Sequence, residues 1–221
     1  MSEPRGDVRL PPRFEQGHPV YVIDPDADVR RSLHRILFTY GLISWPFSSS
    51  SDFLENLPGL KPAPIMIEVQ SESFNGLELL RNILDVGITW PVIGMTANAD
   101  IRTAVRAIQL GAIDILEKPL ELEFLEMSLQ EAMTKLSSIK NKSETRDKSN
   151  RLFELLSPRE TKVMMALMRG ASNKAAAYSL SLSVRTVEMH RAHALGKLKV
   201  KSMVEVIQLS HDAGITLTAE Q

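Results

Sequence analysis

The chain has 221 residues, enough for two modest domains that each bury a core. Its hydrophobic fraction of 43% and charged fraction of 24% are ordinary for a globular protein. The lack of cysteine excludes disulfides, thiolate zinc sites and cysteine nucleophiles. No apolar run reaches the ~18 residues of a membrane span, and residues 1–17 lack the apolar centre of a secretory signal. We therefore expect a cytoplasmic protein without membrane contact, with a flexible segment at residues 1–18.

The net charge of −1 hides a division along the chain. Residues 1–140 carry 13 Lys and Arg against 19 Asp and Glu, whereas residues 141–221 carry 13 against 8. From Arg159 to Lys201, nine basic residues accompany only Glu160 and Glu188. This division indicates an acidic domain followed by one that binds a polyanion, although a solvated basic face would have the same composition.

From residue 19 onward, short apolar runs alternate with helical patterns. The runs predict strands at 20–23, 43–47, 65–67, 92–95 and 113–116, and the periodic segments predict helices at 29–40, 51–57, 77–86, 101–110 and 122–136. This order predicts an α/β fold over residues 19–138, a doubly wound parallel five-stranded sheet with helices on both faces. The functional crevice of such a sheet lies beyond the carboxyl ends of its strands. Four polar residues fall there: Asp24, Glu68, Thr96 and Lys118.

A polar stretch follows this predicted domain. In SSIKNKSETRDKSN, at 137–150, Ile139 is the only large apolar residue. The composition predicts an interdomain linker at 139–151, helical only at its start as an extension of the preceding helix.

Residues 152–221 have only helical patterns. Ser157-Pro158-Arg159-Glu160 forms a helix-start signal, with a capping serine, a proline at the first helical position and a glutamate that bonds back. Gly170 ends this helix, and Ser172 and Ser183 can cap the next two, at 173–180 and 184–198. A fourth helix is expected at 202–213. Four short helices with a tight turn at 181–183 predict an all-α helix-turn-helix domain.

Several stretches of this segment match a known DNA-binding family at unbroken spacing. They are Leu156-Ser157-Pro158-Arg159-Glu160, Gly170-Ala171-Ser172-Asn173-Lys174, Ala176, Ser183-Val184-Arg185-Thr186-Val187-Glu188-Met189-His190-Arg191, Lys197-Leu198 and Glu205. Over about 60 residues the segment resembles the DNA-binding domains of the LuxR/FixJ/NarL family. The resemblance implies a transcription regulator that binds double-stranded DNA, commonly as a homodimer through the fourth helix.

The third helix, 184–198, is the expected reading helix. Val187 and Leu195 can face the core, which leaves the other face for a major groove. Glu188 can accept from the cytosine amine and Met189 can pack on a thymine methyl, while the basic residues are better placed for phosphates. The expected DNA-binding residues are Lys174, Arg185, Thr186, Glu188, Met189, His190, Arg191 and Lys197.

Two further interpretations apply to this domain. His190 and His193 lie three residues apart, but no carboxylate or thiol obviously joins them, so we expect no metal site. On the fourth helix, Met203, Val204, Val206 and Ile207 can form a dimer interface, with core packing the alternative for at least two of them.

The first domain also matches a known family. The matching stretches are Val22-Ile23-Asp24, Val29-Arg30-Arg31-Ser32-Leu33, Gly76-Leu77-Glu78-Leu79-Leu80, Met95-Thr96, Gly111-Ala112-Ile113-Asp114 and Glu117-Lys118-Pro119. They resemble the receiver domain of two-component response regulators, and the FixJ branch most closely. Such a domain takes a phosphoryl group from a histidine kinase onto an aspartate. Two acidic residues hold Mg²⁺, and a threonine and a lysine bind the phosphoryl oxygens.

Three positions depart from that pattern. Glu68 stands at the phospho-acceptor position, Pro25 replaces the second acidic residue, and Ile115 stands where an aromatic switch residue is usual. Asp24, Asp26, Thr96 and Lys118 are retained. Since Pro25 has no ligand for Mg²⁺, the charge of a transferring phosphoryl group cannot be readily neutralised. We therefore predict a pseudo-receiver with no cofactor and no catalytic residue, in which Glu68 can hold Lys118 and Thr96 as a fixed anion.

The departures leave three interpretations open for this domain. Glu68 locks an active-like state with constitutive dimerisation, or the domain docks a partner or senses a small molecule, or the site is only structural. The candidate dimer surfaces are Arg102, Arg106, Gln109 and Leu110 on one predicted helix and Leu122, Leu125 and Leu129 on the next, with most of these leucines favoured as core. The function expected is phosphorylation-independent transcription regulation. The alternative is an adaptor or antagonist that docks a sensor, such as a histidine kinase, or a partner regulator.

Overall fold

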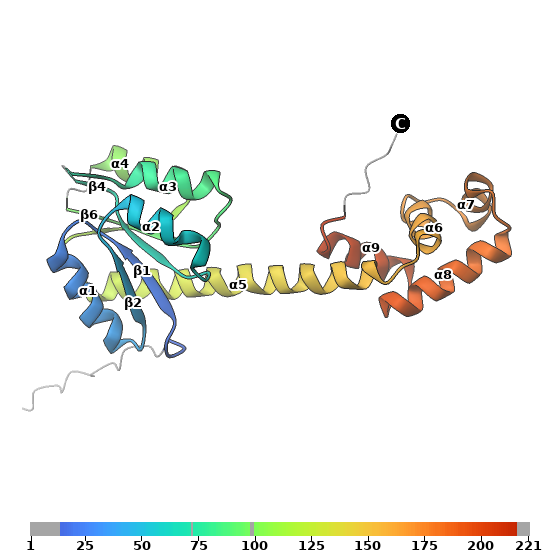
Figure 1. The fold of residues 1–221 in the computed structure, drawn as a ribbon, viewed down its shortest axis with the longest axis horizontal. Helices are drawn as coiled ribbons and strands as arrows, with labels where there is room; N and C mark the ends of the chain where they lie inside the picture. The colour runs from blue at the N-terminus through green and yellow to red at the C-terminus, as the bar shows by residue number, and fades with distance from the viewer. Residues whose placement is uncertain (1–13, 72, 98–99, 216–221) are drawn as a thin grey trace, which may run out of the picture. The chain divides into compact units, whose positions relative to one another are not determined.

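The computed structural model describes residues 14–71, 73–97 and 100–215 (Figure 1). The chain forms two compact units, Met1–Ile139 and Lys140–Gln221. None of the described helices is both long enough and apolar enough to cross a membrane.

The first unit contains the predicted parallel sheet. Its strands are β1 (Pro19–Ile23), β2 (Ile43–Phe47), β3 (Ile65–Glu68), β6 (Val92–Thr96) and β7 (Ala112–Glu117), each within two residues of a predicted strand. All pairs are parallel and the strand order is β2-β1-β3-β6-β7. The helices are α1 (Ala27–Thr39), α2 (Ser50–Asn56), α3 (Gly76–Asp85), α4 (Ile101–Gln109) and the start of α5 (Leu122–Glu154), with a 3-10 turn at Leu57–Gly59. The α/β architecture is confirmed.

Alternation of side chains along the strands divides the core into two layers. Val20, Val22 and Met66 face one way, against α1 and α5, whereas Tyr21 and Ile23 face the other, against α2 and α3. Both faces of the sheet are therefore covered, which explains why its strands are continuous apolar runs.

Two carboxylates lie at the switch point of this sheet. The chain leaves β1 for β2 on one side and enters β3 on the other, so a crevice forms between the carboxyl ends of β1 and β3. Asp24 follows β1 directly and Glu68 is the last residue of β3. The topology thus brings together residues that are far apart in the sequence.

A short hairpin that periodicity did not predict follows Glu68. It consists of β4 (Gln70–Ser71) and β5 (Phe74–Asn75), whose two-residue strands are too short to leave a periodic signal. It closes onto Gly76, where a Cβ atom would lie only 2.0 Å from the carbonyl oxygen of Glu68. Glycine is required here because the backbone of α3 passes so close to the end of β3.

The flexible segment predicted at 1–18 falls largely outside the described residues. Its described part is held against the first unit: Phe14 contacts Tyr40 edge-on at 5.9 Å between ring centroids. The backbone N–H of Gly17 also donates to the carbonyl of Gly41 at 2.9 Å.

The segment 139–151, expected to be helical only at its start, is helical throughout. Helix α5 runs without interruption from Leu122 to Glu154. Leu125 and Leu129 pack in the first unit, while Leu152 and Phe153 pack in the second. The polar residues between them are compatible with a helix because both ends are fixed by packing, and a pair such as Lys140–Glu144 adds local support.

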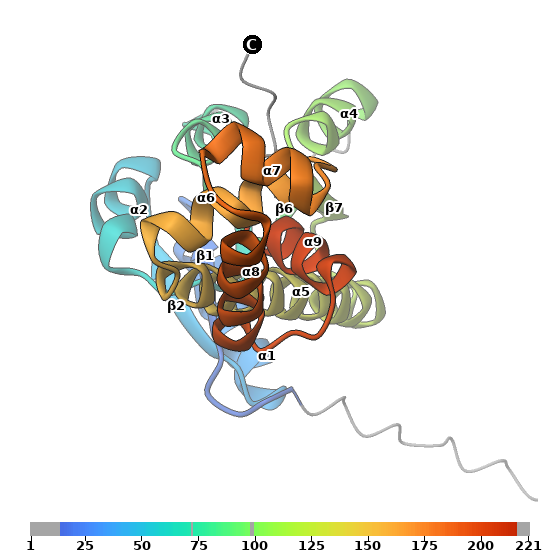
Figure 2. The ribbon, with the colours of Figure 1, turned by 90° about the vertical axis from the view of Figure 1, so that its right-hand side faces the viewer.

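The second unit is the predicted all-α domain. Its helices after α5 are α6 (Pro158–Met168), α7 (Asn173–Leu180), α8 (Val184–Leu198) and α9 (Met203–Asp212). Helix α8 contacts both α6 and α7, and Figure 2 shows this group of helices from the front. Serines 157, 172, 183 and 202 cap the four helices as their side chains accept from backbone N–H groups.

One ion pair connects α6 to α8. The carboxylate of Glu160, only 4% exposed, accepts from Lys197 Nζ at 2.7 Å and from the backbone N–H of Ser157 at 2.7 Å. These hydrogen bonds lower the pKa of Glu160 from 4.5 to about 2, with the Lys197 bond contributing most. Glu160, in the first turn of α6, therefore also fixes the C-terminal half of α8.

This ion pair predicts a pH-dependent stability. Because the pKa of Glu160 is lower in the folded domain, its contribution is complete above about 4.5 and is lost as the pH falls toward 2. We expect Glu160→Gln to destabilise the second unit by about 2 kcal/mol at neutral pH and by less than about half of that near pH 3. Amide hydrogen exchange of α6 and α8 measures both values.

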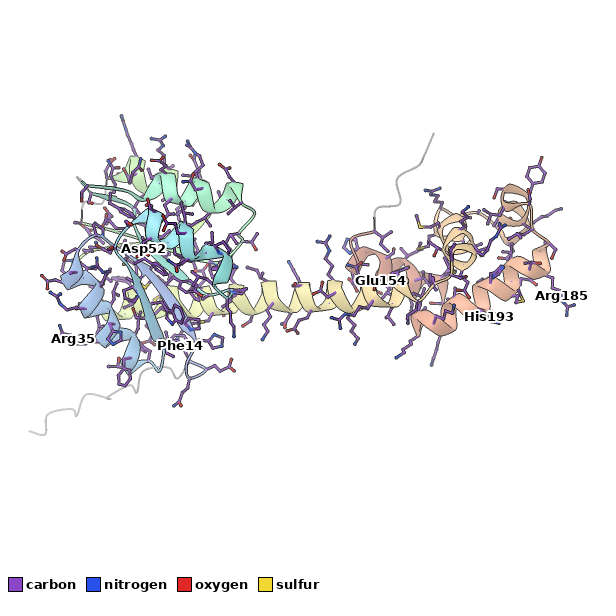
Figure 3. All side chains as sticks on the ribbon, viewed as in Figure 1. Phe14, Arg35, Asp52, Glu154, Arg185 and His193 are labelled. Atoms are coloured by element: carbon purple, nitrogen blue, oxygen red, sulfur yellow. The ribbon has the colours of Figure 1, made fainter. Side chains whose placement is uncertain are left out.

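Glu154→Gln is the matched control, because Glu154 is exposed at the end of α5 (Figure 3). A penalty for Glu160→Gln that stays equal across this pH range would contradict the assignment.

Candidate functional site

At the switch point, one ammonium group lies between two buried carboxylates. Lys118 Nζ donates to Asp24 Oδ2 at 2.6 Å and also to Glu68 Oε2. Asp24 is fully buried, Glu68 is 2% exposed, and the Lys118 side chain retains 14% exposure. The structure thus brings Asp24, Glu68 and Lys118 together, and the positive charge of the lysine is paired with both carboxylates.

The remaining carboxylate oxygens are occupied as well. Asp24 Oδ1 accepts from the backbone N–H of Asp26 at 2.9 Å, and Glu68 Oε1 accepts from that of Gln70 at 3.0 Å. Each of the four oxygens of this pair therefore accepts a hydrogen bond. Thr96, 3% exposed, borders the same region, and its carbonyl accepts from the Lys118 backbone N–H at 2.8 Å.

The electrostatics of Lys118 follow from this arrangement. Burial alone would lower its pKa, but the hydrogen bonds and negative charges of Asp24 and Glu68 outweigh burial and raise the pKa above its usual value. The lysine therefore stays charged over the physiological range and holds both carboxylates.

The donor set does not fit the Mg²⁺ that a receiver would hold. Mg²⁺ requires nearly octahedral oxygen ligands, yet Asp24 and Glu68 are committed to Lys118, and Pro25 has no ligand. Asp26 is exposed, and its carboxylate caps α1 by accepting from the backbone N–H of Asp28 at 2.7 Å. Across the described ranges, no group of three or more His, Cys, Asp or Glu side chains is placed to hold a metal ion.

Ile115, at the switch position, packs inward. It is half-buried against the core layer on the α2 and α3 side of the sheet. Gly94 on the neighbouring strand leaves the space that it fills: a Cβ atom at Gly94 would lie 2.4 Å from Ile115 Cδ1 and 2.7 Å from Val69 Cγ2. The Ile115 side chain therefore fits against the neighbouring strand only because Gly94 has no side chain.

On the second unit, α8 presents most of the expected reading residues. Arg185, Glu188 and Met189 are exposed, whereas Val187 is fully buried and anchors the helix to α7. Figure 3 shows Arg185 at the start of α8 with its side chain directed away from the helix bundle. Lys174 is exposed on α7, and Thr186, His190 and Arg191 are half-buried. Thr186 also hydrogen-bonds Ser183 at 2.7 Å between the two hydroxyl oxygens.

Lys197, one of the expected DNA-binding residues, also has a partner within its own domain. Its ammonium group is paired with Glu160, so its contact within the domain is structural. Conversely, Tyr178 on α7 is 91% exposed, although the sequence analysis did not single it out. An exposed tyrosine next to helical alanines has no periodic signal, so only the structure shows how far its ring is exposed.

Apolar side chains are also exposed at the candidate dimer surfaces. On α9, Val204 and Ile207 are exposed while Val206 is buried. On α5, Leu122 is exposed, whereas Leu125 and Leu129 are core residues, as the sequence favoured. The further exposed apolar residues on α4 and α5 are Ile101, Val105, Ile108, Phe124 and Met127.

Comparison with known proteins assigns both units to known domain families. Residues 20–130 match the response regulator receiver domain family, and residues 154–210 match the bacterial regulatory proteins of the luxR family. The chain is 35% identical to the transcriptional regulatory protein FixJ of Bradyrhizobium diazoefficiens, over 90% of this chain and 97% of that one. It is 30% identical to nodulation protein W of the same organism, over 89% of this chain and 87% of that protein.

The chain belongs to the LuxR/FixJ family of response regulators. Two solved structures of this kind cover most of it. The response regulator StyR has 29% identity and a TM-score of 0.74, over 88% of this chain and 98% of that one. Full-length FixJ from B. japonicum has 33% identity and a TM-score of 0.56, over 91% of this chain and all of that one. This response regulator is therefore a DNA-binding transcription regulator of a two-component system.

We call the contacts of Lys118 with Asp24 and Glu68 the bridge. The bridge predicts that Lys118 is essential to the stability of the first unit. Lys118→Met leaves two buried carboxylates facing each other, which we expect to cost about 3–5 kcal/mol of unfolding free energy. Urea denaturation followed by tryptophan fluorescence measures this directly, because both tryptophans, Trp45 and Trp90, lie in the first unit.

The second substitution Glu68→Gln removes one of the opposed charges, so the double variant should recover more than half of that loss. Lys135→Met, at an exposed position of α5, is the control and should change little. A double variant as unstable as Lys118→Met alone would contradict the bridge.

The reading helix predicts two distinguishable effects on DNA binding. Arg191→Ala should weaken binding to all sequences and reduce the salt slope by about 1, as expected for a phosphate contact. Glu188→Ala should instead change base preference at one position by about 1–3 kcal/mol. Fluorescence anisotropy on a duplex chosen by in vitro selection, at several salt concentrations, measures both.

Lys148→Ala is the control, because Lys148 is exposed on α5 away from α8 in the sequence. If neither the Arg191 nor the Glu188 variant alters binding, α8 is not the reading helix.

Proposed function

We propose that this response regulator is a sequence-specific transcription regulator whose receiver-like domain works without phosphoryl transfer. Its control comes from dimerisation or partner binding of that domain. The observation that carries the proposal is the double hydrogen bond from Lys118 to Asp24 and Glu68.

The bridge argues against phosphorylation on chemical grounds. An incoming phosphodonor needs a carboxylate oxygen free to attack and a cation to neutralise the transferring group. Here the Glu68 oxygens are held by Lys118 and by the Gln70 N–H, and the position of a second metal ligand is Pro25. The acceptor oxygens are therefore already occupied, and the second acidic ligand is replaced by a proline.

Glu68 supports a fixed-anion role instead. Its carboxylate provides one negative charge to Lys118, where a phosphoryl group would provide about two. Ile115, filling the space next to Gly94, is already turned inward, so the aromatic rotation of a typical receiver has no counterpart. Both features favour one persistent state of the domain.

Exposed apolar residues provide surfaces for assembly. Val204 and Ile207 on α9 suit a homodimer on DNA, and the apolar residues on α4 and α5 suit pairing of the receiver-like domain or docking of a sensor protein. The exposed face of α8 favours a regulator over the adaptor alternative, because an adaptor has no use for a solvent-facing reading helix.

Intact mass spectrometry tests the proposal directly. We expect the native chain, incubated with acetyl phosphate and Mg²⁺, to show no added phosphoryl group. The control is the double variant Pro25→Asp/Glu68→Asp, which restores an acceptor and an acidic ligand and should gain the adduct through the retained Thr96 and Lys118. A stable adduct on the native chain would overturn the pseudo-receiver.

A further inference from the structure

The first unit contains a groove between α3 and α4 that the acceptor site does not use. It is lined by Asn75, Leu77, Glu78, Arg81, Arg106 and Leu110, and has a volume of about 250 Å³. A second hollow of about 420 Å³, which shares Asn75, Leu77 and Arg106 with it, continues along the β4–β5 hairpin. Together these volumes suit a small organic molecule.

Two arginines are among the residues that line this groove. Arg81 comes from α3 and Arg106 from α4, and neither has an ion pair or side-chain hydrogen bond with another described residue. Glu78 is the one acid among the described lining residues. Its carboxylate accepts weakly from Asn75 Nδ2 at 3.4 Å and forms no ion pair with either arginine within the described ranges. The described lining residues therefore carry a net positive charge.

Apolar surface accompanies these charges. Leu77 and Leu110 are half-buried in the lining, and Phe74 closes the adjoining hollow. Arginine presents a planar fork that binds a carboxylate through two parallel hydrogen bonds. Two such forks beside an apolar wall match a carboxylate attached to a compact apolar body better than they match inorganic phosphate.

We propose that the α3–α4 groove binds a small organic acid, and that this ligand is the input of the receiver-like domain. The inference rests on the proposed function, since it supplies an input for a domain that no longer accepts phosphate. The groove is connected to the acceptor site: Gln70 donates its backbone N–H to Glu68, and its side-chain oxygen accepts from Thr103 on α4 at 3.2 Å. Helix α4 also bears the exposed Ile101, Val105 and Ile108, so a ligand on Arg106 acts on the helix that carries this apolar surface.

Titration of the full-length chain with small carboxylates, observed by ¹H–¹⁵N NMR, tests this inference. The probes are succinate, benzoate and a series of short mono- and dicarboxylates, with inorganic phosphate as a separate arm. We expect at least one acid to shift the Nε–Hε signals of Arg81 and Arg106 saturably, with a Kd below about 1 mM. Arg81→Gln and Arg106→Gln should each weaken this binding at least about tenfold.

Arg35→Gln is the matched control and should bind like the native chain. Arg35 is exposed on α1 (Figure 3), which packs on the other core layer from α3. Arg106→Lys keeps the charge but loses the fork, so it should bind more weakly than the native chain. The inference is overturned if no acid binds saturably, if phosphate alone binds, or if binding survives in Arg81→Gln/Arg106→Gln.

These outcomes are separate from those of the proposed function. If the native chain forms no phospho-adduct and binds no acid, the proposed function stands and this inference is overturned. If the native chain forms a phospho-adduct, the proposed function is overturned, whichever ligand the groove binds.

Discussion

The ammonium group of Lys118 separates two buried carboxylates that would otherwise repel each other at the switch point of the sheet. Asp24 and Glu68 can both stay charged there because each gives one oxygen to this lysine and the other to a backbone N–H. The arrangement satisfies every polar atom of the pair, which is the condition for a stable buried ion pair. It also occupies the carboxylate oxygens that phosphoryl transfer would use. The stability of the first unit and the proposed independence from phosphorylation therefore rest on the same contacts.

The DNA-binding unit uses a comparable device for another purpose. Glu160 is a buried residue of α6 that orients Lys197 of α8. Its carboxylate also accepts from the backbone N–H of Ser157 and so caps the start of α6. The contact with Lys197 fixes the half of α8 that does not carry Arg185 and Glu188, so the reading residues project from a rigid helix. Val187 anchors the other half against α7. A rigid helix lowers the conformational entropy that DNA binding costs.

Much of this could be predicted from the sequence. The five strands were predictable because each is a short apolar run, and the helix starts were predictable because serines and a proline mark them. Glu68, Pro25 and Ile115 were found by their position in a known pattern. Other features depend on contacts between distant residues and leave no local signal. The pairing of Lys197 with Glu160, the fit of Ile115 beside Gly94 and the groove between Arg81 and Arg106 are of this kind. The polar composition of 139–151 favours a linker, whereas the packing of both ends of α5 makes the segment a continuous helix.

The affinity of the full-length chain for its selected DNA site, measured with and without acetyl phosphate and Mg²⁺, tests the central claim most directly. If Lys118 already holds Asp24 and Glu68 in their working arrangement, the Kd will be the same under both conditions. A Kd that tightens about tenfold or more with the phosphodonor would show that the domain still responds to phosphate, and would contradict the account.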